Sequence, residues 1–80
     1  MITIEIVELL RACLRDVESA SGAARPDVEW LRLRCDDTLG YAGQSQWDSL
    51  RQLGKDAAQF ISDFPGVLPP LLEAVVAQNT

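Results

Sequence analysis

The sequence contains no histidine. Without an imidazole, the chain cannot form Ser-His or Cys-His nucleophile pairs, imidazole metal sites, or a histidine acid-base pair that works near neutral pH. Asp36 and Asp37 are adjacent carboxylates, but neighbouring side chains on a helix diverge by about 100° and do not converge on one small ligand. We therefore expect a protein that is not an enzyme and that has no cofactor and no metal ion.

Cysteine is scarce as well, and the two cysteines, Cys13 and Cys35, are too far apart to form a Cys-x-x-Cys motif. Each falls on the apolar line of its own expected helix, where a free cysteine usually acts as a small hydrophobic residue. Met1 runs directly into Ile-Thr-Ile-Glu, without the basic start and the small-residue cleavage site of a secretory leader. Together these features predict a reducing, cytoplasmic setting.

Basic residues are few: seven Lys and Arg stand against twelve Asp and Glu, which gives a net charge of −5. Binding to nucleic acid or to an anionic membrane surface depends on clustered cations, and the arginines here are scattered among acids. The longest apolar run, 67–72, contains two prolines and is far shorter than the roughly 20 residues of a membrane-spanning helix. We expect no nucleic-acid ligand and no membrane; a nucleic-acid mimic that presents acids to a DNA-binding protein stays open as a third class of function.

What the sequence does have is helical periodicity. A first helix is expected from Thr3, as its N-cap, to about Ala20, and a second from Pro26 toward Tyr41. Their expected buried residues are spaced three and four apart: Ile6, Leu10, Cys13, Val17 and Ala20, widened by Leu9 and Leu14, in the first helix, and Val28, Leu31, Cys35 and Leu39 in the second.

A third helix is expected to begin near Ser45, where Ser45 and Asp48 have the spacing of a capping box, and to end at Pro65-Gly66. Its expected buried line consists of Trp47, Leu50, Gly54, Ala57, Ile61 and Phe64, with Leu53, Ala58 and Phe60 beside it. The small residues in the middle of this line suggest a close approach by another helix. A short last helix, from Pro69 to about Ala77, completes an all-α fold: a bundle of three main helices plus a short C-terminal helix, in one domain that spans residues 1–80.

The stretch Trp47-Asp48-Ser49-Leu50 resembles the modification site of acyl and peptidyl carrier proteins, which are also small, acidic and helical. The resemblance implies that Ser49 carries phosphopantetheine. The match departs from the carrier pattern because Ser45-Gln46-Trp47 stands where carriers usually have Leu-Gly-x. We keep a carrier protein as the alternative function.

The main functional prediction rests on an excess of apolar side chains over what three short helices need to cover one another. The expected partner-binding residues come from the second helix and the last segment: Trp30, Leu33, Tyr41, Val67, Leu68, Leu71, Leu72, Val75 and Val76. Part of the last helix should close the core, and the rest should bind protein, either a foreign partner or a second copy in a homodimer. A small acidic helical protein of this kind fits a bacterial or phage regulator or inhibitor that covers a surface of a larger protein.

Overall fold

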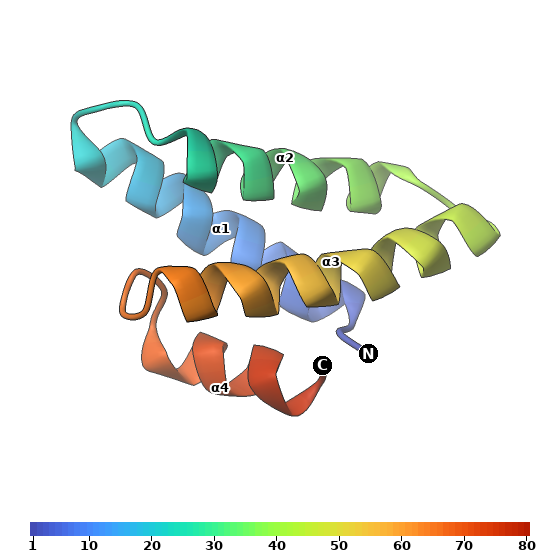
Figure 1. Ribbon diagram of the computed structural model, residues 1–80. Coiled ribbons are helices and arrows are strands. Elements are labelled where there is room, and N and C mark those ends of the chain that lie inside the picture. Colours follow the sequence, from blue (N-terminus) through green and yellow to red (C-terminus); the bar gives the residue numbers. More distant parts are fainter.

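A computed structural model describes residues 1–80 as four helices without strands, which confirms the predicted all-α bundle. The helices are α1 (Ile4–Ser21), α2 (Pro26–Gly40), α3 (Gly43–Asp63) and α4 (Pro70–Gln78). Helix α2 packs on α1 and α3, and α4 packs on α1 and α3 as well. In Figure 1, α2 and α4 lie on opposite sides of the pair formed by α1 and α3.

Two of the predicted helix starts are confirmed by local chemistry. Thr3 caps α1, and its Oγ1 accepts a hydrogen bond from the backbone N–H of Ile6 at 3.3 Å. Helix α2 begins at Pro26, whose missing amide is no loss in a first turn. The short α4 begins at Pro70, one residue later than expected, with Pro69 as its N-cap.

The predicted capping box at Ser45 is wrong. Helix α3 begins two residues earlier, at Gly43, so Ser45 already lies inside the first turn. Gly43 has a φ of 58°, a conformation that glycine adopts with little strain, and this lets the chain reverse from α2 into α3 across Tyr41 and Ala42. Asp48 instead accepts a hydrogen bond from the Gln44 side chain at 2.9 Å.

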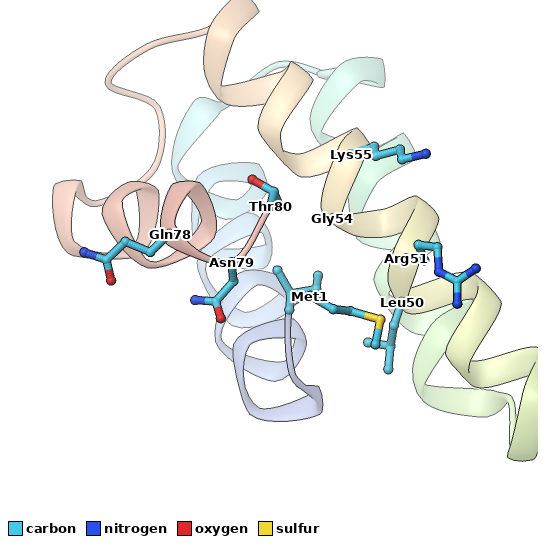
Figure 2. A pocket seen from close by; sticks show the side chains of 9 residues that line it. Met1, Leu50, Arg51, Gly54, Lys55, Gln78, Asn79 and Thr80 are labelled. Atoms are coloured by element: carbon cyan, nitrogen blue, oxygen red, sulfur yellow. The ribbon is translucent and has the colours of Figure 1, made fainter.

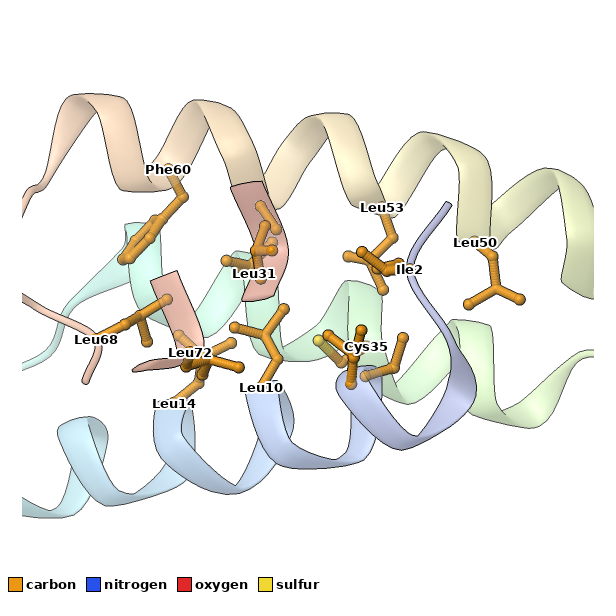
Figure 3. Packing of buried hydrophobic residues seen from close by; sticks show 14 of the residues in the cluster. Ile2, Leu10, Leu14, Leu31, Cys35, Leu50, Leu53, Phe60, Leu68 and Leu72 are labelled. Carbon is orange, nitrogen blue, oxygen red and sulfur yellow. The ribbon is translucent and has the colours of Figure 1, made fainter. Parts of the chain in front are cut away.

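The core is a single cluster to which every helix contributes. Figure 3 shows Leu10 of α1, Leu31 of α2, Leu53 of α3 and Leu72 of α4 among the side chains of this cluster. Ile2, which precedes α1, is also fully buried beside α3. In a chain of this length each of these side chains contributes a large share of the stability, about 1.5–3 kcal/mol when fully buried.

Several residues of the predicted buried lines lie at the surface. Leu9 and Ala20 of α1 are exposed, and Val7, which the predicted line did not include, is fully buried. Trp47 is exposed at the edge of a hollow that it shares with the residues that lead into α1. Phe64 is partly exposed at the end of α3, so the inward face of α3 is rotated from the predicted one.

The chain segments closest to Gly54, the small residue in the middle of α3, do not belong to a helix. A Cβ atom on Gly54 would lie 3.1 Å from Cγ2 of Thr80 and 3.9 Å from two atoms of Ile2. The segments that approach Gly54 most closely are therefore the residues before α1 and after α4. The predicted close approach exists, but chain segments outside the helices make it.

Ion pairs tie α1 to α2 along one edge. Arg32 contacts Glu18 of α1 and also Asp36, at 2.9 Å, one turn further along α2. Arg32 and Asp36 stand four positions apart, which places them on the same face of α2. Hydrogen bonding to Glu18 raises the pKa of the Arg32 guanidinium further. Arg11 of α1 approaches the other oxygen of Asp36 at 3.6 Å, and Arg15 of α1 approaches the same oxygen at 3.9 Å. Together with Arg32–Glu18, three arginine-carboxylate contacts therefore join α1 to α2.

None of the four helices has both the length and the hydrophobicity that a membrane span requires.

Candidate functional site

The predicted partner-binding residues do not form one surface. Trp30, Leu33 and Tyr41 are exposed on α2 or at its end, whereas the remaining six belong to the C-terminal segment. Since α2 and α4 lie on opposite sides of α1 and α3 (Figure 1), the two groups face different directions. The structure therefore offers two separate candidate surfaces.

The C-terminal segment divides between core and surface, as its helical period requires. Leu68, Leu72 and Val76 are buried in the core and are not available to a partner. Leu71 is 82 % exposed, and Val67 and Val75 are partly exposed. The prediction that part of this segment closes the core is thus confirmed, and three of the six residues are left as candidates for an interface.

The first candidate surface is a hollow of about 230 Å³ between α1 and α4. We call it the α1–α4 surface and define it by Leu9, Cys13, Leu71 and Val75, which line it together with Pro69 and Leu72. Leu9 is 58 % exposed, which the sequence pattern did not predict. No charged side chain lines this hollow. Through Cys13 and Pro69 it continues into a second hollow of about 310 Å³ beside Val17 and Val67.

The second candidate surface is a pocket of about 230 Å³ between α2 and α3, which we call the α2–α3 pocket. It combines aromatic and acidic side chains: Trp30, Phe60, Phe64, Asp27, Asp56 and Asp63, with Gln59. Trp30 is 52 % exposed, which confirms that it lies off the buried line of its helix. The sequence pattern gave no sign that α3 would place two acids and two phenylalanines beside this indole.

Arg25 borders the α2–α3 pocket. Its guanidinium carbon lies 5.7 Å from the centre of the Phe64 ring, and the ring of Phe64 is 5.2 Å from that of Phe60. Arg25 also forms an ion pair with Asp27. Hydrogen bonding to Arg25 lowers the pKa of the Asp27 carboxyl, so Asp27 stays ionised at neutral pH.

The largest hollow, about 370 Å³, lies where the residues before α1 and after α4 meet α3. Figure 2 shows the side chain of Met1 extending toward Leu50 of α3, with the side chains of Arg51 and Lys55 directed away from it. Only three of its nine lining residues are hydrophobic, and five of the nine lie on α3 or α4. It lacks the continuous apolar lining of the α1–α4 surface.

Ser49, the residue that the carrier alternative requires, is only 7 % exposed and lies in the second turn of α3. Its Oγ is 2.6 Å from Oγ1 of Thr38, which is fully buried in α2. Attachment of a phosphopantetheine arm needs a hydroxyl that a modifying enzyme can reach. In this structure the hydroxyl instead bridges two helices of the bundle.

The two cysteines lie in apolar surroundings. Burial raises the pKa of the Cys35 thiol to about 12, and burial together with the nearby Asp16 raises the pKa of Cys13. Both thiols are therefore protonated and weakly nucleophilic near neutral pH. No group of three or more Cys, Asp or Glu side chains is close enough together to hold a metal ion.

Comparison of the chain with protein-family models, with curated proteins and with solved structures gives no match in any of the three.

Proposed function

We propose that this protein is a non-enzymatic, cytoplasmic protein-interaction module, a regulator or inhibitor that covers a surface of a larger protein. The observation that carries the proposal is the α1–α4 surface, where Leu71 is 82 % exposed and Leu9 is 58 % exposed across one uncharged hollow. Burying a leucine side chain in an interface contributes about 1.5–3 kcal/mol. Two leucines on adjacent helices therefore supply a sizeable driving force for association.

The shape of this surface suits a helical or extended apolar segment of a partner. Leu9 and Cys13 are spaced one turn apart on α1, and Leu71 and Val75 have the same spacing on α4, so two short apolar rows flank the hollow. Such grooves between helices bind the apolar face of a partner helix. The continuation past Pro69 toward Val67 lengthens the groove.

Charge favours a foreign partner over a second copy. Each copy carries a net charge of −5, so two copies repel one another at low ionic strength. A larger protein with a neutral or basic surface does not meet this repulsion. A homodimer through the same residues is the competing outcome, and the experiment below separates the two.

The experiment begins with light scattering coupled to size-exclusion chromatography. A monomeric wild type is then used as bait in lysate of the native host, beside Leu9→Gln, Leu71→Gln and the matched control Ala77→Gln, an exposed position elsewhere on α4. We expect one protein to be retained by wild type and Ala77→Gln and lost with both leucine variants. A dimer that only the leucine variants dissociate would identify a second copy as the occupant. Retention of the same partner by all four proteins would refute a role for the α1–α4 surface.

The carrier alternative is not supported by the position of Ser49, whose hydroxyl is enclosed between α2 and α3.

A further inference from the structure

The α2–α3 pocket has a composition suited to a cation. Aromatic side chains and carboxylates line the same small space: Trp30 is half-exposed there, and Asp56 and Asp63 come from α3 on the other side. Aromatic faces attract cations through their quadrupole, and carboxylates do so through their charge. The two effects act on the same ligand when they share one cavity.

The acids of the pocket are not equally neutralised within the protein. Arg25 pairs with Asp27, and Nε of Arg34 lies 3.7 Å from Asp56. Asp63 has no basic side chain within ion-pair distance and receives one hydrogen bond, from the amide of Gln59 at 2.9 Å.

The helix itself adds to the negative potential at Asp63. Asp63 is the last residue of α3, where the helix macrodipole is negative, and no basic residue lies in the last turn of α3. A positive group at this end of the pocket is therefore favoured by Asp63 and by the helix terminus together.

We propose that the α2–α3 pocket binds an arginine side chain from a basic segment of a partner protein. The guanidinium would lie against the exposed indole of Trp30 and pair with Asp63. Arginine fits better than lysine because its planar group stacks on aromatic rings and bonds carboxylates through two N–H groups at once. The same chemistry is already present beside the pocket, where Arg25 lies over Phe64 and pairs with Asp27. This inference does not depend on the α1–α4 surface, which is a separate site.

The test uses the intact protein labelled with ¹⁵N and a short glycine peptide that contains one arginine. Two matched peptides carry lysine or the neutral isostere citrulline in place of the arginine. The indole N–H signals of Trp30 and Trp47 report binding, with Trp47 as the internal reference because it lies outside the pocket. We expect the arginine peptide to shift the Trp30 signal progressively and to leave the Trp47 signal in place. We expect weaker binding of the lysine peptide and none of the citrulline peptide.

A pair of protein variants separates the pocket from the general negative charge of the molecule. Asp63→Asn removes the proposed partner of the arginine, whereas Asp48→Asn removes an exposed acid of the same helix that pairs with a glutamine in the same way. Both changes reduce the net charge by the same amount. We expect Asp63→Asn to weaken binding of the arginine peptide about fivefold and Asp48→Asn to weaken it less than twofold.

Phe64→Leu serves as a second variant, read from the same signals, and should also weaken binding about threefold. Circular dichroism confirms that each variant is folded before it is titrated. Three results would overturn the proposal: no shift of the Trp30 signal with the arginine peptide, equal binding of the lysine or citrulline peptide, or equal loss in Asp63→Asn and Asp48→Asn. Loss of partner capture in Leu71→Gln with retained peptide binding would support two independent sites.

Discussion

A buried pair of hydroxyls between α2 and α3 provides the sharpest test of the structure. Oγ1 of Thr38 lies 2.6 Å from Oγ of Ser49, and the same Thr38 oxygen donates to the backbone carbonyl of Arg34 at 2.9 Å. A hydroxyl has one proton to give, so Ser49 must be the donor in the contact with Thr38. Thr38 is fully buried and Ser49 is 7 % exposed, so water does not readily replace either bond.

The expected loss in free energy of unfolding depends on which group each substitution leaves without a hydrogen-bond partner. Ser49→Ala removes a donor but leaves the proton of Thr38 bonded, and should lower the free energy of unfolding by about 1 kcal/mol. Thr38→Val keeps the side-chain shape but leaves the Ser49 proton without this acceptor. It should lower the free energy of unfolding by about 1–2 kcal/mol. The double variant leaves neither hydroxyl without its partner. Its loss in free energy of unfolding should therefore be smaller than the sum of the losses in the two single variants, by at least ~0.5 kcal/mol.

The assay is urea unfolding followed by far-UV circular dichroism, with thermal unfolding as a second readout. A loss of 1 kcal/mol corresponds to a decrease of about 4–8 °C in Tm for a domain of this size. Ser62→Ala, at an exposed position of α3, is the control for the change in helix propensity and should alter stability by less than about 0.5 kcal/mol. Strictly additive effects of the two substitutions, or an effect of Ser49→Ala no larger than that of Ser62→Ala, would show that the two hydroxyls are not bonded. Such a result would also restore Ser49 as a candidate modification site.

Three further predictions concern other parts of the chain. Incubation with a phosphopantetheinyl transferase should give no mass increase, because the Ser49 hydroxyl is enclosed; an adduct at Ser49 in the folded protein would reinstate the carrier alternative. Gly54→Ala should raise the free energy of unfolding by about 0.5–1 kcal/mol, the gain in helix propensity, because the only tight contact, 3.1 Å to the Thr80 methyl carbon, involves an exposed side chain that can move. A loss of stability in urea unfolding of Gly54→Ala would mean that this contact is rigid. Burial raises the pKa of Cys35 from 9.0 to about 12, so the stability that the neutral thiol contributes is complete below pH 9.0 and declines as the pH rises toward 12. Urea midpoints of wild type should accordingly fall more steeply over this range than those of Cys35→Ala, and parallel slopes would contradict the burial of the thiol.

The sequence by itself determined where the helices lie. Thr3 and Pro26 mark helix starts through their own hydrogen-bonding chemistry, and Pro65-Gly66 ends α3 because neither residue continues a helix readily. Periodicity also identified most of the core, including Leu31 and Leu53, since a helix must bury one face. The shift of the start of α3 to Gly43 escaped prediction because it depends on how α2 and α3 are joined.

Only the tertiary structure decided which part of each wide apolar stripe faces inward. Leu71 and Leu72 are adjacent and chemically identical, yet one is exposed and the other is buried, because the rotation of α4 is set by its packing on α1 and α3. The same holds for Leu9, which the neighbouring helices leave uncovered. The α2–α3 pocket likewise joins Trp30 to Asp63, more than thirty positions away in the sequence. The sequence pattern of a helix gives the period of that helix alone. A binding surface depends on how several helices are placed relative to one another.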